Sequence, residues 1–356
     1  MKILFVASNL QAFGGLQAGN RKLVGVLREL GENVDVLELP RVSLFQKMLF
    51  VARFSMRVLF GRPDFVFASN LNYAPMGFFA KKLLGVPYAV RIWGIEVQRT
   101  PKPLHRQALR ATDCVVTAFS ETARNVVRQI PETKERLVTI PNTIEGSPFE
   151  IKPRREDLVQ KFKLGGAKVI LTIGRMSILD GDNKGYMRVI RAMPKILKNV
   201  PNVLYLLAGT GDDVPNVQKL VKELGLIDKV VLAGPVEAGD MVDFYNLGDV
   251  FALPSKNEGF PAFVLLEALA CGVPVLGGAQ PDARELFHEK YGLIVQPDSV
   301  EEISQSLVKI LSGDVPTNIL DRIKLRSMVL REYGPEAYRE AVKKAVQSFS
   351  AQTKRN

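Results

Sequence analysis

Two carboxylates with eight residues between them, Glu258 and Glu267, mark the stretch of this sequence best suited to chemistry. Glu267 stands inside the apolar run VLLEALA, where a charged side chain needs a partner or a polar cavity. Pro261 suits the first turn of a helix, and Gly272 suits the position just past its end. The pattern therefore predicts a loop that carries Glu258 and a helix that carries Glu267. From the residues alone, Glu267 is either a paired acid of the core or a group that binds a ligand.

Two cations lie in another loop. Arg175 directly follows a buried run, and Lys184 precedes the next helical pattern. A forked guanidinium and a compact ammonium in one loop could clamp a diphosphate, while ordinary solvated charges are the alternative. The acidic turn Asp180-Gly181-Asp182 lies between them, but it has no further metal ligands nearby. We therefore expect no metal site there.

The elements that must position these side chains alternate along the chain as short Val/Ile/Leu-rich runs and longer helical patterns. Such alternation is typical of parallel sheets covered by helices on both faces. The predicted strands are 3–7, 34–39, 65–69, 88–92, 114–118, 137–140, 169–173, 203–208, 230–233, 250–253, 275–277 and 293–295. We expect one doubly wound domain at 1–150, a polar linker at 151–166 and a second doubly wound domain at 167–334.

In such sheets ligands bind beyond the carboxyl ends of the strands, and four further loops lie there. Gly14-Gly15 before a helix either lets backbone N–H groups approach an anion or forms a plain turn. Trp93 and Glu96 are either a polar pair for a sugar hydroxyl or structural residues. In the second half, the small residues 209–211 could admit a nucleotide, although the third glycine of a dinucleotide fingerprint is absent. Backbone groups at 233–236 could meet a base edge.

The composition excludes several classes of site. Only two cysteines occur, Cys114 and Cys271, each in an apolar context, which favours a reducing cytoplasm over a disulfide. Two histidines and no Cys/His cluster leave no plausible zinc site or catalytic triad. We also expect neither a signal peptide nor a transmembrane helix, because no apolar run of spanning length is free of charge.

The net charge of +11 lies entirely in the first half, where residues 1–165 carry 25 Lys and Arg against 14 Asp and Glu. This asymmetry indicates an anionic partner: a lipid headgroup, a phosphorylated acceptor or nucleic acid. The segment 44–60, LFQKMLFVARFSMRVLF, is apolar nearly all round, with Gln46, Arg53 and Arg57 on one stripe. It is either a buried helix of an interdomain layer or an interfacial helix on an anionic membrane.

Over nearly its whole length, the sequence resembles the family 4 glycosyltransferases, retaining enzymes of the GT-B architecture. The motifs that carry the resemblance are Gly14-Gly15, Pro141-Asn142-Thr143, Gly174-Arg175 with Lys184-Gly185, Gly209-Thr210-Gly211 and the block PSKNEGFPAFVLLEALACGVPV. The resemblance implies an α/β fold of two facing Rossmann-like domains with a cleft between them. The first would bind the acceptor and the second the nucleotide sugar. The C-terminal REYGPEAYREAVKKAV is similar to the family's closing helices, so a helix at about 335–350 would pack back on the first domain.

The resemblance also implies roles for individual residues. Arg175 and Lys184 would bind the donor diphosphate and stabilise the charge that develops as the nucleoside diphosphate leaves. Glu267 would accept hydrogen bonds from the ribose hydroxyls, and Glu258 would lie near the transferred sugar. The catalytic candidates are therefore Arg175, Lys184 and Glu258. The donor-binding candidates are Glu267 together with Gly14, Gly15, Gly211, Val236, Gly259, Phe260 and Phe263.

The sequence departs from the family pattern at two places. The family's paired glutamates usually have seven residues between them, one fewer than here, so the carry-over is firmer for Glu267 than for Glu258. The family often has His before Gly in the loop after the fourth strand, where this sequence has Trp93. We expect Trp93 to stack on a sugar face or an acceptor chain, and Trp93 and Glu96 are the acceptor-binding candidates.

Together with these patterns, the resemblance implies a cytoplasmic, metal-independent, retaining hexosyltransferase that needs no cofactor and uses a UDP- or GDP-sugar. Its acceptor would be a glycan or a lipid-linked precursor, with peripheral contact to an anionic inner membrane face, in polysaccharide or glycolipid biosynthesis. In this family the leaving phosphate takes the acceptor's proton, so no side-chain nucleophile is required. The alternatives are a nucleotide-sugar epimerase or phosphorylase on the same architecture, and a basic nucleic-acid-binding protein, which we do not favour.

Overall fold

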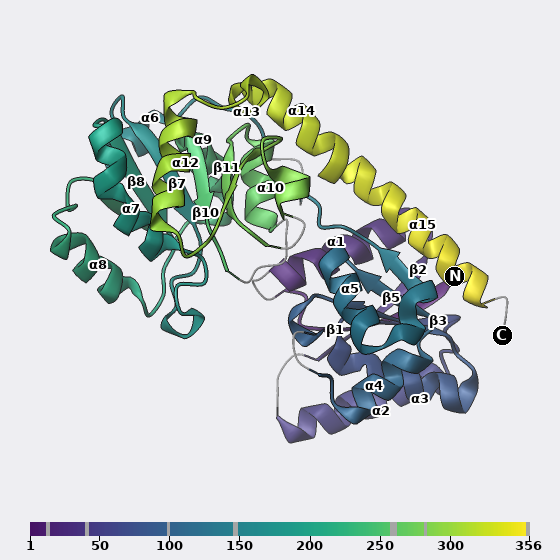
Figure 1. Cartoon of the computed structure of the whole chain (residues 1–356). Coiled ribbons are helices and arrows are strands. Elements are labelled where there is room, and N and C mark those ends of the chain that lie inside the picture. The colour runs from purple at the N-terminus through teal and green to yellow at the C-terminus, as the bar shows by residue number, and fades with distance from the viewer. Residues whose placement is uncertain are drawn as a thin grey trace. The chain divides into compact units, whose positions relative to one another are not determined.

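The computed structural model describes residues 1–11, 15–39, 43–97, 100–144, 149–256, 262–280 and 283–353. The chain forms two compact units (Figure 1). Unit 1 comprises Met1–Glu145 and Pro335–Asn356, and unit 2 comprises Gly146–Gly334. Within the described residues each unit contains a six-stranded parallel sheet flanked by helices, which confirms the doubly wound folds predicted for the two halves.

The sheet of unit 1 has the strand order β2-β1-β3-β4-β5-β6. Its strands are β1 (Lys2–Ser8), β2 (Asn33–Leu39), β3 (Phe65–Ala68), β4 (Tyr88–Ile92), β5 (Cys114–Thr117) and β6 (Leu137–Thr139). Its helices are α1 (Gly15–Glu29), α2 (Leu44–Leu59), α3 (Ala74–Leu84), α4 (Pro103–Ala111), α5 (Ser120–Gln129) and α15 (Pro335–Thr353), with short 3-10 turns at Leu71–Tyr73, Ile95–Val97 and Pro131–Arg136. The strands β1, β3, β4 and β5 are buried along nearly their whole length because helices cover both faces of the sheet: α1 and α15 cover one, and α2 to α5 the other.

The sheet of unit 2 has the order β12-β11-β10-β7-β8-β9. Its strands are β7 (Lys168–Ile173), β8 (Val203–Ala208), β9 (Val230–Gly234), β10 (Val250–Leu253), β11 (Val275–Gly278) and β12 (Gly292–Val295). Its helices are α6 (Glu156–Lys161), α7 (Tyr186–Asn199), α8 (Val214–Glu223), α9 (Met241–Leu247), α10 (Phe263–Ala270), α11 (Ala283–Phe287), α12 (Val300–Ser312), α13 (Thr317–Leu320) and α14 (Arg322–Tyr333), with 3-10 turns at Ile178–Asp180 and Ala238–Asp240. Every strand predicted from the sequence is present, within a residue or two of its predicted ends.

The segment 151–166, expected to be a polar linker, lies within unit 2 and contains α6. Leu158, Phe162 and Leu164 are buried, and the Phe162 ring packs edge-on against Phe244 of α9. These three apolar residues anchor a segment whose many charges suggested a solvated connection. Searched over the described residues, no helix combines the length and the apolar character needed to cross a bilayer.

The helix α15 packs on the sheet of unit 1. Tyr338, Val342, Ala345 and Phe349 are buried in the same cluster as the strands and α1. The Phe349 ring stacks on Phe65 with centroids 4.9 Å apart. The last helix of the described chain therefore completes the core of the domain that the first residues begin.

We expect Phe349→Ala to lower the free energy of unfolding of unit 1 by about 3–5 kcal/mol, because the deletion leaves a cavity beside Phe65. Lys343→Ala, at an exposed position of the same helix, should change it by less than about 0.5 kcal/mol. The chain has a single tryptophan, Trp93, in unit 1, so its fluorescence during urea unfolding reports on this unit. Equal midpoints for the two variants would contradict the packing described here.

Candidate functional site

Most of the predicted donor-binding residues that the structure describes gather at the carboxyl edge of the sheet in unit 2. The strands β10, β7 and β8 are neighbours in this sheet. Arg175 follows β7, Gly211 follows β8, and α10 follows β10. Phe263 opens α10 and Glu267 lies one turn later, so the two side chains share a face of the helix. The structure therefore brings these candidates to one edge of one domain.

Other candidates are placed elsewhere or are not described. Gly14, Glu258, Gly259 and Phe260 lie outside the described residues, and their roles stay predictions. Gly15 is exposed at the start of α1 in unit 1, and Val236 is partly buried just after β9 in unit 2.

The glycines after β8 allow two backbone loops to touch. A Cβ atom at Gly209 would overlap the carbonyl oxygen of Gly174, and one at Gly211 would overlap that of Met176. Both glycines have positive φ, +130° and +156°, which side chains disfavour. The Met176 amide also donates to the carbonyl of Thr210 at 3.0 Å. The sequence suggested room for a nucleotide here, and the structure gives these glycines a definite structural reason.

The two predicted cations lie in the loop after β7: Arg175 is close behind the strand, and Lys184 stands just before α7. A Cβ at Gly174 would lie 3.0 Å from Cδ of Lys184 and 3.9 Å from its Nζ, so the lysine side chain crosses the end of β7. The Arg175 side chain is 71% exposed and pairs with Asp180, with 3.1 Å between Nη2 and Oδ2. An ion pair this exposed contributes about 0–1 kcal/mol. The guanidinium can therefore exchange Asp180 for an anionic ligand at little cost.

A buried arginine that the sequence did not single out ties the loops of this edge together. Arg188 of α7 is buried, and its Nη2 donates to the carbonyls of Asp182 at 2.7 Å and Pro254 at 3.1 Å. Its Nη1 lies 3.3 Å from Oδ1 of Asp298, to which Lys256 also pairs at 2.6 Å. The Lys256 ammonium is the main cause of the lowered pKa of Asp298. The loops after β7, β10 and β12 are thus joined through one guanidinium. The sequence feature that could have identified Arg188 is its position among the apolar residues of α7.

The acidic turn 180–182 after β7 forms ion pairs with Arg175 and Arg188. Asp180 pairs with Arg175, and Oδ2 of Asp182 lies 3.3 Å from Nε of Arg188. Asp182 has a positive φ of 55°, accepts the Met187 amide at 3.1 Å, and has a pKa raised by burial. No group of three or more His, Cys, Asp and Glu among the described residues could hold a metal ion. Metal independence stays a prediction.

Glu267 has a buried partner. The hydroxyl of Tyr245 on α9 donates to Oε2 of Glu267 at 2.6 Å. Tyr245 is fully buried, and its pKa is raised first by burial and then by the carboxylate charge, so the phenol stays protonated and remains a donor. Glu267 itself is only partly buried. It has the partner expected of a core acid and the exposure expected of a ligand group, and Tyr245 holds it in orientation.

The acceptor candidates of unit 1 brace their own loop. The Trp93 indole N–H donates to the carbonyl of Ser69 at 2.9 Å, and the Trp93 amide donates to Oε2 of Glu96 at 3.0 Å. Burial raises the pKa of Glu96, and hydrogen bonds from the loop backbone oppose that shift. These contacts are the structural role that the sequence left open. A contact with an acceptor stays a prediction.

Beside Trp93 lies an arginine that sequence reasoning missed. Arg91 in β4 is 1% exposed, and its guanidinium carbon lies 3.9 Å from the centroid of the Trp93 ring. Burial lowers its pKa, and the phenol of Tyr338 on α15 opposes that shift. Among the described residues its Nε has no hydrogen-bond partner. The sequence feature that could have identified Arg91 is a charged residue within the strand YAVRI.

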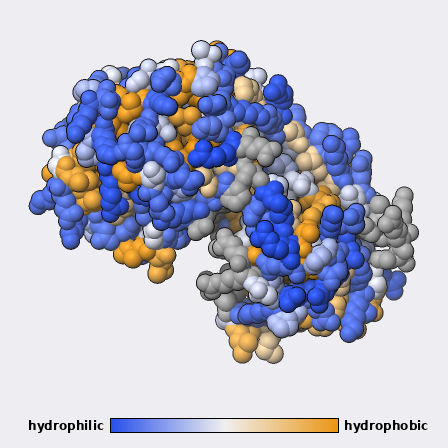
Figure 2. Space-filling view, viewed as in Figure 1, coloured by the Kyte–Doolittle hydropathy of each residue, from blue (hydrophilic) through white to orange (hydrophobic). Residues whose placement is uncertain are grey.

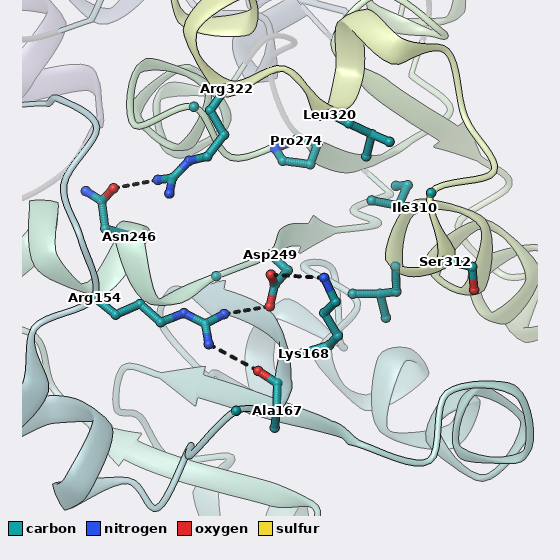
Figure 3. A pocket seen from close by; sticks show the side chains of 15 residues that line it. Arg154, Ala167, Lys168, Asn246, Asp249, Pro274, Ile310, Ser312, Leu320 and Arg322 are labelled. Atoms are coloured by element: carbon teal, nitrogen blue, oxygen red, sulfur yellow. Dashed lines mark hydrogen bonds and ion pairs between the residues drawn. The ribbon is translucent and has the colours of Figure 1, made fainter.

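A pocket of about 520 Å³ lies at the opposite edge of the unit 2 sheet, where β7, β10 and β11 begin (Figure 3). Its polar groups bond one another. Nη2 of Arg154 lies 2.6 Å from Asp249, and Nη2 of Arg322 donates to Oδ1 of Asn246 at 2.6 Å. Because this pocket lies at the amino ends of the strands, it is distinct from the predicted donor site.

Comparison with known proteins bears on both halves of the chain. Two family models match: "Glycosyl transferase 4-like domain" over residues 14–143 and "Glycosyl transferases group 1" over residues 154–326. The chain is similar to the GDP-mannose-dependent alpha-(1-6)-phosphatidylinositol monomannoside mannosyltransferase of Mycobacterium tuberculosis, with 28% identity over 230 residues, 61% of this chain and 58% of that protein. It is 30% identical to an uncharacterised glycosyltransferase of Methanocaldococcus jannaschii over 247 residues, 65% of this chain and 62% of that protein. The match therefore spans about three fifths of the length of these relatives.

Among solved structures, Anabaena HepE in complex with UDP superposes with a TM-score of 0.77 at 18% identity, over 98% of this chain and 100% of that one. The paired parallel sheets and this likeness define a glycosyltransferase fold of the GT-B architecture. With both halves matched by glycosyltransferase models, the chain belongs to the family 4 glycosyltransferases.

The close loop contact yields a prediction. Gly209→Ala should destabilise unit 2 by about 1–3 kcal/mol, because the new Cβ forces the loops after β7 and β8 apart at a strained φ. Gly239→Ala is the matched control, since a Cβ there meets open space and its φ is not positive. Urea unfolding followed by circular dichroism measures both. Equal stability of the two variants would show that the loops separate without cost.

Proposed function

We propose that this chain is a retaining hexosyltransferase that uses a UDP- or GDP-sugar and requires neither a metal ion nor a cofactor. The observation that carries the proposal is the placement of Arg175, Lys184 and Glu267 at the carboxyl edge of one sheet. Two cations from one loop suit a diphosphate, and a carboxylate held by a buried phenol suits a pair of ribose hydroxyls.

The proposed mechanism follows from these charges. Arg175 and Lys184 stabilise the negative charge that accumulates on the diphosphate as its bond to the sugar breaks. A phosphate oxygen of the leaving group takes the proton of the acceptor hydroxyl, and that hydroxyl attacks the same face of the sugar. The configuration at the anomeric carbon is retained, and no protein nucleophile takes part.

The acceptor is the second part of the proposal. We infer a lipid-linked or glycan acceptor held by unit 1 at the inner face of a membrane, with the protein in the cytoplasm. The relatives named for transfer to phosphatidylinositol monomannoside support a glycolipid, and the positive charge of residues 1–165 supports an anionic surface.

Arg175→Ala and Lys184→Ala should each lower kcat by roughly 10²–10³-fold, because each removes a charge that stabilises the leaving group. Lys219→Ala, at an exposed position of α8, should leave the rate unchanged. The measurement is sugar transfer from the donor that stabilises the chain most in a thermal-shift screen of UDP, GDP and their sugars. Stabilisation by none of these, or wild-type rates in both variants, would overturn the donor site. The same variant tests the alternative of a nucleic-acid-binding protein, for which Arg175→Ala should leave nucleic-acid binding unchanged.

Glu267→Gln should weaken binding of the stabilising nucleoside diphosphate by roughly 10–100-fold, the worth of hydrogen bonds to a charged acceptor. The control is the 2′,3′-dideoxy form of the same nucleotide, which has no ribose hydroxyls to donate. The substitution should change the Kd of that analogue little, as titration calorimetry can measure. Equal losses for both nucleotides would mean that Glu267 acts through the stability of α10 and not through the ribose.

A further inference from the structure

One face of α2 is apolar and exposed. Among its described residues only Phe50, Phe54 and Val58 are buried. Eight large apolar side chains along this helix and its C-cap are exposed: Leu44, Phe45, Met48, Leu49, Val51, Met56, Leu59 and Phe60. Figure 2 shows hydrophobic atoms at the surface of unit 1 where Figure 1 places the first turns of α2. Unit 1 itself therefore does not cover this face of α2, and such apolar patches on a protein surface mark interaction sites.

The neighbouring helix extends this surface. Phe79, Leu83 and Leu84 of α3 are exposed, and a groove of about 460 Å³ runs between α2 and α3. Its described lining is Val51, Phe54, Ser55, Val58 and Leu59 of α2 with Pro75, Met76, Phe79, Ala80, Leu83 and Leu84 of α3. The one polar side chain in that lining, Ser55, donates its hydroxyl to the carbonyl of Val51 at 3.0 Å. The groove therefore offers a side-chain surface suited to hydrocarbon.

Basic residues surround the apolar face. Over their described residues, α2, α3 and α4 carry seven Lys and Arg and no Asp or Glu. Lys47, Arg53 and Lys82 are exposed. On a helical wheel of α2, Lys47 and Arg53 lie on the two sides of the exposed apolar arc. An apolar face flanked by cations is complementary to a lipid surface with anionic headgroups.

We propose that the α2–α3 face docks unit 1 on an anionic membrane, with the apolar side chains among the acyl chains, the groove occupied by one acyl chain, and Lys47, Arg53 and Lys82 at the headgroups. The inference deepens the proposed function, since it would bring the chain to a lipid-linked acceptor. A second copy of this chain fits the surface poorly, because pairing the two faces would set cation against cation.

Flotation with lipid vesicles tests the proposal. The intact chain should float with vesicles of phosphatidylcholine containing phosphatidylglycerol, and much less with phosphatidylcholine alone. Lys47→Glu, Arg53→Glu and Lys82→Glu should each weaken partition by about fivefold or more, the worth of at least one charge near an anionic surface. The combined variant Met48→Ser, Met56→Ser, Phe60→Ser should abolish it. All these positions are exposed, and circular dichroism verifies that each variant folds.

The controls come from unit 2. Ile227→Ser removes an equally exposed apolar side chain, and Lys219→Glu reverses an exposed charge; neither should change flotation. A separate experiment tests the groove. The native chain has a single tryptophan, Trp93, and the variant Val51→Trp adds a second one in the groove. Lipids brominated along their acyl chains should quench the fluorescence of the added tryptophan more strongly than that of Trp93. If that quenching is absent, the proposal that an acyl chain occupies the groove is wrong.

Three results would overturn the docking proposal: no flotation with anionic vesicles, flotation that the triple serine variant retains, or a dimer in solution that the same variant dissolves. The thermal shift with nucleotide separates this failure from failure of the proposed function. Nucleotide binding with no flotation leaves a transferase acting on a water-soluble acceptor. Flotation without nucleotide binding leaves the docking face standing and removes the donor site.

Discussion

The carbonyl oxygens of Gly174 and Met176 occupy the space that side chains at 209 and 211 would need, so the loops after β7 and β8 are held together by backbone contact. The cations of the candidate site are arranged around that contact. It fixes the end of β7, from which Arg175 leaves and over which Lys184 lies. Arg188 then connects this loop to Pro254, which follows β10, and to Asp298, which follows β12. The strand β10 is the one that leads into α10. A site assembled this way presents its cations on a frame that needs little reorganisation when an anion arrives.

The sequence predicted the strands well, because buried parallel strands leave near-continuous apolar runs bounded by glycine and polar loops. It also placed Arg175, Lys184 and Glu267 at one sheet edge, because parallel strands end on the same side. It could not supply the partners of these residues. Tyr245 lies 22 residues before Glu267, and Arg188 meets Asp298 across 110 residues. Such pairings depend on how helices pack, which no local pattern records. The prediction that 151–166 is a polar linker was wrong, because the many charges of this segment outweighed its three apolar residues, which are buried in unit 2.

Unit 1 distributes polarity in an unusual way. It buries a charged group, Arg91, between Trp93 and α15, while it leaves apolar side chains of α2 and α3 at the surface. A buried guanidinium is weak evidence for stability, since its desolvation is costly and an apolar replacement is often as stable. What it does provide is orientation, because the planar group lies against the Trp93 indole, with its guanidinium carbon 3.9 Å from the ring centroid. Both departures from ordinary patterning sit in the half of the chain that carries the whole net positive charge.

The placement of α15 has a consequence for how the chain matures on the ribosome. Unit 2 is one continuous stretch, whereas unit 1 is made from both ends of the described chain. Phe65 and Phe67 emerge early, but the helix whose Phe349 stacks on Phe65 and meets Phe67 edge-on is made only after all of unit 2. At about 5–20 residues per second, these two rings wait roughly 15 to 55 seconds for their cover. The later domain can finish folding first, and nascent unit 1 is in that interval a natural client for a chaperone that shields exposed hydrocarbon.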